Sequence, residues 1–177
     1  MKHKRIRPRL WTKDFSCITV ATVLSAIGGE AMNLPISLLV FDQTQSTLLS
    51  ALILVCGMLP DMILPILVAP LIDKGGKKKW IVGLDILLAT VYAAMGIWIT
   101  GHAFSYGLYV GFTLVVGTIS VFYRLAFDAW YPSLIPVGAE QRGYSVSATL
   151  YPLVTILMAP VATFLYSHVP MGTLFLV

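Results

Sequence analysis

Residues 47–79 read TLLSALILVCGMLPDMILPILVAPLIDKGGKKK, an apolar stretch that ends abruptly in glycines and lysines. The apolar part, residues 47–72, contains a single charged side chain, that of Asp61. A helix needs about 20 predominantly apolar residues to cross the hydrocarbon core of a bilayer. The stretch therefore predicts a membrane-spanning helix whose end is marked by positive charge.

The rest of the chain has the same character. Of its 177 residues, 58% are hydrophobic and 11% are charged, whereas a soluble domain carries about 25% charged residues. Too few polar side chains remain to cover a water-soluble surface, so we predict an all-α integral membrane protein in a lipid bilayer. Five apolar runs are long enough to cross the membrane and a sixth begins at the end of the chain: 15–41, 47–72, 80–100, 105–127, 144–167 and 171–177.

Positive charge is confined to alternate connectors between these runs. Six of the 12 Lys and Arg residues lie in residues 1–14, four lie in residues 74–79, and Arg124 and Arg142 flank the connector after the fourth run. Because cytoplasmic loops collect Lys and Arg, residues 1–14 are predicted to be a basic cytoplasmic N-terminus of a plasma-membrane protein. A nucleic-acid partner is not predicted, since binding one would need an exposed basic face on a soluble domain.

Enzymatic motifs are missing from the sequence. It contains no P-loop, no HExxH, no CxxC and no Ser-His-Asp arrangement, so we predict neither an enzyme nor a cofactor. His102 and His168 lie on separate connectors without Cys or carboxylate neighbours at ligand spacing, so no metal site is predicted. Cys17 and Cys56 are expected at different depths and therefore unpaired.

A carboxylate in the middle of a membrane helix is the clearest functional signal. Such a charge is costly and usually faces a bundle interior or a water-filled cavity. Glu30 lies midway along the first run, and polar or small residues recur at helical spacing on its face: Thr22, Ala26, Glu30, Asn33 and Ser37. The stripe has two interpretations: a path for protons or a cationic substrate, or a neutral Glu30 hydrogen-bonded within a packed helix interface.

Four further features of the apolar runs are weaker signals. Asp61 follows Pro60, where it could serve the freed backbone or line the same cavity as Glu30. Asp85 lies close to the lysine cluster and is interpreted as structural. The fifth run carries a polar face that could border the cavity or join helices, formed by Ser147, Tyr151 and Thr155. In the fourth run, GxxxG at Gly107 and Gly111 is a weak signal of close helix packing.

Residues 69–79, APLIDKGGKKK, resemble the loop between the second and third helices of the major facilitator superfamily, written G-x-x-x-D-R/K-x-G-R/K-R/K. Ala69 replaces the first glycine. Five residues match in type and spacing: Asp73, Lys74, Gly76, Lys77 and Lys78. Residues 25–41, 59–79 and 122–153 are similar to successive helices of the drug-exporter-like branch, so the resemblance covers nearly the whole chain.

The resemblance implies a twelve-helix protein whose two six-helix halves rock around a central site. Residues 15–177 would then form the transmembrane N-terminal half-bundle, with five complete helices and the start of a sixth. We expect the chain to be a fragment that lacks its C-terminal half. The resemblance also implies a gating loop, in which Asp73 contacts the opposite half and Lys77 pairs with an acid at the inner end of the fourth helix, for which Asp128 is the candidate.

The function implied is secondary-active transport of a small-molecule substrate. We predict proton-coupled efflux of small amphipathic or cationic solutes, with the substrate and proton path formed by Glu30, Asn33, Asp61 and Tyr151. The fifth run has Ala159-Pro160 where many exporters of the superfamily carry a glycine-proline motif associated with antiport. The alternative is a non-transporting helical membrane protein that acts through interaction with other proteins.

Overall fold

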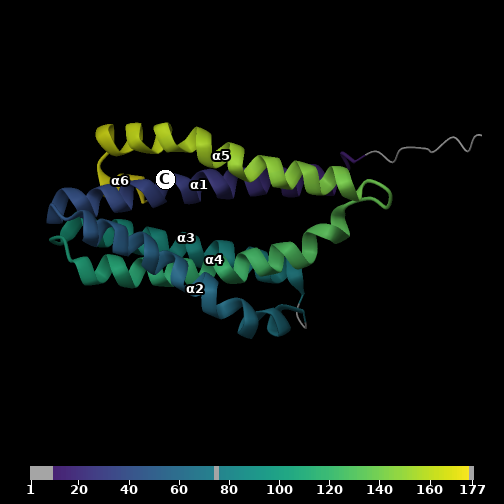
Figure 1. The fold of residues 1–177 in the computed structure, drawn as a ribbon, viewed down its shortest axis with the longest axis horizontal. Helices are drawn as coiled ribbons and strands as arrows, with labels where there is room; N and C mark the ends of the chain where they lie inside the picture. Colours follow the sequence, from purple (N-terminus) through teal and green to yellow (C-terminus); the bar gives the residue numbers. More distant parts are fainter. Residues whose placement is uncertain (1–9, 74–75, 176–177) are drawn as a thin grey trace, which may run out of the picture.

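The computed structural model describes residues 10–73 and 76–175, in which all regular structure is helical (Figure 1). The helices are α1 (Lys13–Thr44), α2 (Thr47–Asp73), α3 (Lys77–Gly101), α4 (Tyr106–Leu134), α5 (Glu140–His168) and the short α6 (Met171–Leu174). Among the described residues, five helices are long and apolar enough to cross a membrane. The predicted all-α membrane fold with five complete spans is therefore confirmed.

The helix ends differ most from prediction around the connector between α4 and α5. The fourth apolar run was predicted to end at residue 127 and the fifth to begin at 144, but α4 continues to Leu134 and α5 begins at Glu140. The reason is that hydropathy marks where a helix leaves the lipid, while the polar residues that follow can continue the helical hydrogen bonding. Residues 135–139 form the connector that remains.

The helices run up and down the long axis of the bundle in two layers (Figure 1). α1 packs mainly on α5, whereas α2 and α3 both pack on α4. The connectors after α1, α3 and α5 lie at one end. Lys13, Lys77 and Arg142, which begin or lie near the start of α1, α3 and α5, lie at the other, which we call the basic end.

Apolar clusters hold the two layers together at both ends of the bundle. Far from the basic end, the largest cluster joins five helices through Met32, Ile36, Val40, Ile53, Met95, Tyr109, Phe112, Leu174 and Phe175. At the basic end, Phe15 and Ile18 of α1 pack against Tyr131 and Ile135, while Val68 and Ile72 of α2 pack against Ile81 and Ala126. The middle of the bundle is left less filled.

α2 and α4 are in close contact at two glycines. A Cβ atom added to Gly117 would lie 2.5 Å from the carbonyl oxygen of Gly57 and 3.3 Å from Pro60. By contrast, a Cβ at Gly107 or Gly111 would meet nothing within 4 Å. The prediction of close packing at the GxxxG pair is wrong, because the crossing point falls on the next glycine of α4.

We expect Gly117→Ala to destabilise the bundle by roughly 1–3 kcal/mol, because the added methyl group would push α2 away from α4. Gly111→Ala is the matched control and should raise or leave unchanged the thermal unfolding temperature, since that position is open. Thermal unfolding of both variants in detergent measures the difference. Equal stability of the two variants would contradict the crossing.

Candidate functional site

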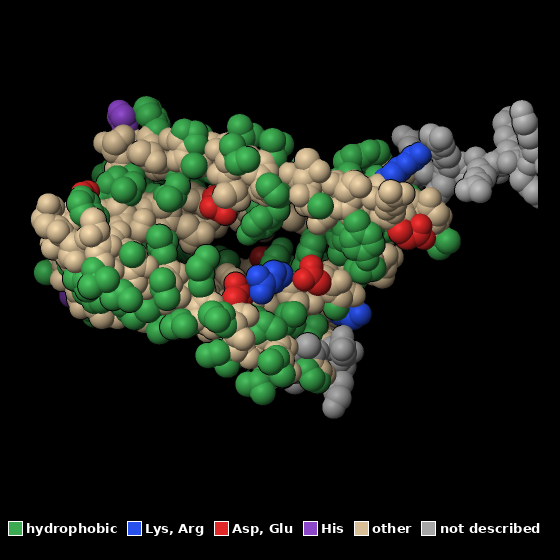
Figure 2. Space-filling view, viewed as in Figure 1, with side chains coloured by type: hydrophobic (Ala, Val, Ile, Leu, Met, Phe, Trp, Pro, Cys, Tyr) green, Lys and Arg blue, Asp and Glu red, His purple; other side chains and the backbone are tan. Residues whose placement is uncertain are grey.

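A cavity of about 710 Å³ lies in the middle of the bundle, between the apolar clusters of its two ends. Its walls come from α1, α2, α3, α4 and α5, and most of them are apolar or aromatic. Figure 2 shows the hollow between the two layers, with acidic and basic side chains gathered along it. A cavity of this size with a few charged groups is typical of a small-molecule site.

Glu30 lines this cavity from the middle of α1 and is half-buried. The hydroxyl group of Thr155 on α5 donates a hydrogen bond to Glu30 Oε1 at 3.1 Å. Among the described residues, no Lys, Arg or His side chain forms a salt bridge with Glu30. The carboxyl group therefore faces the cavity without a salt-bridge partner among the described residues.

The predicted polar stripe of α1 divides between two environments. Thr22, Ala26 and Asn33 line the cavity together with Glu30. Ser37 is buried, and its hydroxyl group donates to the carbonyl oxygen of Leu34 instead. The stripe thus faces the cavity over its first part and packs within the bundle beyond it.

Asp61 is held by an arginine that the sequence analysis did not count among the site residues. Arg124 Nη2 lies 2.8 Å from Asp61 Oδ1, and Arg124 Nη1 lies 3.3 Å from Asp61 Oδ2. Arg124 had been interpreted as a charge flanking the connector, but it lies inside α4 and lines the cavity. The sequence did contain a signal for this ion pair, namely Asp61 on α2, because a charge at membrane depth usually has a partner.

Tyr151, the remaining residue predicted for the substrate and proton path, lies on α5. It lines the cavity and lies within electrostatic range of Glu30, Asp61 and Arg124. Ser147, one turn earlier, also lines the cavity. The four residues predicted for the substrate and proton path therefore share one cavity, to which α1, α2 and α5 each contribute.

The described residues of the predicted loop between α2 and α3 lie at the basic end. Lys77 Nζ donates a hydrogen bond to the carbonyl oxygen of Ala129 at 2.8 Å, so α3 and α4 are joined there. The predicted pair between Lys77 and Asp128 is not formed in this structure: Lys77 is bound to the neighbouring Ala129, and Asp128 lines the central cavity. Gly76 caps the start of α3 and Lys78 is exposed. The side chain of Asp73 and all of Lys74 lie outside the described residues.

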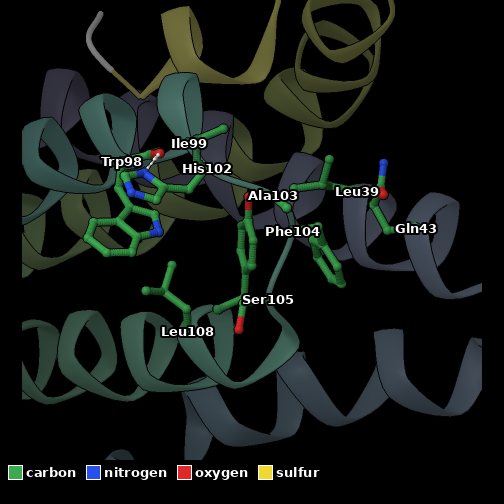
Figure 3. Close-up of a pocket in the computed structure, with 10 residues that line it drawn as sticks. Leu39, Gln43, Trp98, Ile99, His102, Ala103, Phe104, Ser105 and Leu108 are labelled. Carbon is green, nitrogen blue, oxygen red and sulfur yellow. Dashed lines mark hydrogen bonds between the residues drawn. The ribbon is translucent and has the colours of Figure 1, made fainter.

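A second, smaller pocket of about 180 Å³ lies at the end of the bundle opposite the basic end (Figure 3). His102 stacks on Trp98 with ring centroids 4.0 Å apart, and its Nδ1 lies 3.1 Å from the carbonyl oxygen of Trp98. None of the described residues that line this pocket is a carboxylate, a lysine or an arginine. Within residues 10–73 and 76–175, no group of three His, Cys, Asp or Glu side chains could hold a metal ion. The central cavity is the candidate site.

Comparison with known proteins gives one family and two curated relatives. The transmembrane secretion effector family matches residues 8–142. Macrolide efflux protein A of Streptococcus pyogenes, and the protein of the same name from its serotype M6, are each 26% identical to the chain over 161 residues. The alignment covers 89% of this chain and 39% of each relative, so the chain spans about two fifths of their length. No solved structure matches significantly.

The family match covers most of the chain and agrees with the helical membrane fold and with the resemblance found in residues 69–79. The chain therefore belongs to the transmembrane secretion effector family, a drug-exporter-like group of the major facilitator superfamily, and is a multi-pass membrane protein.

Proposed function

We propose that the chain is the N-terminal part of a secondary-active efflux transporter, which exchanges protons for small amphipathic or cationic solutes. The observation that carries the proposal is the central cavity, in which Glu30 presents a carboxylate without a cationic partner among the described residues. A carboxylate in such a position can bind either a proton or a cationic group. Binding of one therefore excludes the other, which is the requirement for exchange.

The lining of the cavity supports an amphipathic substrate. Aromatic and aliphatic side chains cover most of the wall, while Asn33 and Tyr151 supply polar groups near Glu30. The relatives are named for macrolide efflux, so macrolides are the first substrates to test. Asp61 attracts a cationic substrate less strongly than Glu30, because Arg124 is already bound to Asp61.

Alternating access would require contacts that form in one state and break in the other. The hydrogen bond from Lys77 to Ala129 is a candidate, since it ties α3 to α4 at the basic end. We propose that the predicted gating residues act at this gate: Asp73, Lys74, Gly76, Lys77, Lys78 and Asp128. A C-terminal half would supply the opposing wall of the cavity.

Everted membrane vesicles from cells that express the full-length product of the reading frame test the proposal. We expect erythromycin or ethidium to accumulate in these vesicles when their interior is acidic, and to leave when nigericin collapses the pH gradient. Vesicles from cells without the protein are the control. Accumulation that nigericin does not change would contradict proton exchange.

The proposed orientation places the N-terminus in the cytoplasm of a cell whose plasma membrane holds the protein. After Cys17 and Cys56 are replaced by serine, single cysteines at Lys78 and Gln43 can be labelled with a membrane-impermeant maleimide in intact cells. We expect labelling at residue 43 alone, because positive charge stays on the cytoplasmic side. Labelling of both positions from outside would contradict the topology.

A further inference from the structure

Asp85 is a carboxylate of the cavity that the proposed exchange does not use. It is the acidic residue of α3, its side chain is exposed, and it lines the central cavity with Leu84 and Leu88 of the same helix. The sequence analysis had interpreted Asp85 as structural, because it lies close to the lysines that begin α3. Its place in the cavity wall gives it access to a bound solute.

Asp85 lies in a different part of the cavity from Glu30. Asp85 is the ninth residue of α3 and Glu30 is the eighteenth residue of α1, and both helices begin at the basic end. At 1.5 Å rise per residue, Asp85 lies about 12 Å along its helix and Glu30 lies about 26 Å along its own. Asp85 is therefore displaced from Glu30 toward the basic end of the bundle.

Arg124 forms its salt bridge with Asp61 and not with Asp85. Tyr123 and Arg124 are consecutive residues, so their side chains leave α4 about 100° apart. Asp85 lies on α3 and Asp61 lies on α2, and these helices both pack on α4. Among the described residues, no Lys, Arg or His side chain forms a salt bridge with Asp85.

Three carboxylates of the cavity form no salt bridge among the described residues, those of Glu30, Asp85 and Asp128, and Asp128 lies one helical turn from Arg124 on α4. Glu30 and Asp85 lie on separate helices and share an otherwise largely apolar and aromatic wall. We propose that Asp85 is a second cation-binding carboxylate and that the cavity takes amphipathic molecules with two separated positive charges, one at Glu30 and one at Asp85. This inference rests on the proposed transport function, whose cavity and exchange step it uses. Asp85 would then set specificity for dications over monocations.

Ethidium and propidium are suitable probes, because they share a phenanthridinium ring and propidium carries a second positive charge on an alkyl arm. Proton-driven accumulation of each is measured in everted vesicles for the wild type, Asp85→Asn and Asp85→Glu. We expect Asp85→Asn to lower the propidium-to-ethidium ratio of transport efficiency about fivefold, the effect of one partly solvated ion pair. Asp85→Glu should largely restore the ratio.

Asp14→Asn is the matched control, since Asp14 lies in the first turn of α1 and does not line the cavity. Its ratio should equal that of the wild type. If the wild type transports both probes and Asp85→Asn leaves their ratio unchanged, the inference about Asp85 fails while the transport function stands. A wild type that moves neither probe in response to a pH gradient would overturn both.

Discussion

Vesicles that carry the Glu30→Gln variant are expected to lose proton-driven efflux and to accumulate no more solute than vesicles without the protein. Glutamine has nearly the same shape as glutamate, and its carbonyl oxygen can still accept the hydrogen bond from Thr155 that is 3.1 Å long in the structure. It can neither carry the negative charge that attracts a cation nor exchange a proton. The loss should therefore fall on transport and spare folding.

Two measurements separate these effects. The amount of Glu30→Gln protein in the membrane and its thermal unfolding temperature in detergent should match the wild type, and efflux by Asp14→Asn should be normal. If Glu30→Gln supports efflux at the wild-type rate and with the wild-type response to pH, Glu30 is not in the proton path. The carboxylate would then be a structural partner of Thr155, as the second interpretation of the α1 stripe holds.

Replacing Arg124 with glutamine is expected to lower transport more than tenfold with little loss of stability. The two side chains of the Asp61–Arg124 pair are 53% and 41% exposed, with Arg124 the more exposed. Exposed ion pairs contribute only about 0–1 kcal/mol to stability. The loss of transport should be larger than the loss of stability. An unpaired Asp61 adds a negative charge within electrostatic range of Tyr151, which is also within electrostatic range of Glu30.

The double variant Asp61→Asn/Arg124→Gln tests the reason for this loss. If Arg124 acts by neutralising Asp61, the double variant should transport better than Arg124→Gln alone, and a double-mutant cycle gives the size of the coupling. Arg124→Lys keeps the charge but loses the two-point contact, so it should lie between the wild type and Arg124→Gln. Wild-type transport by Arg124→Gln would exclude a role for the pair.

The sequence was sufficient to predict the helices but only part of the site. Each membrane span can be predicted locally, because a run of apolar residues indicates it without any knowledge of the other helices. Glu30 and Tyr151 could be chosen in the same way, because a polar side chain stands out in an apolar helix. Both lie in the central cavity, as do Asn33 and Asp61.

Arg124 and Asp85 were not assigned to the cavity, because their place in it depends on packing between helices. Each lies near an end of an apolar run, where a charge is normally assigned to the membrane surface. In the structure, α4 continues past its apolar run to Leu134. Arg124 of α4 and Asp85 of α3 both line the cavity. The close approach of Gly57 and Gly117 is likewise a property of two helices, so the GxxxG spacing within α4 could not locate it.

The central claim is that protons and solute share one carboxylate, and reciprocal coupling in proteoliposomes tests it most directly. The purified full-length protein is reconstituted with the pH indicator pyranine inside, and an ethidium gradient is imposed without any pH gradient. We predict that ethidium movement drives protons in the opposite direction, because linkage between two ligands of one site is mutual. Ethidium transport that leaves the internal pH unchanged would contradict the account.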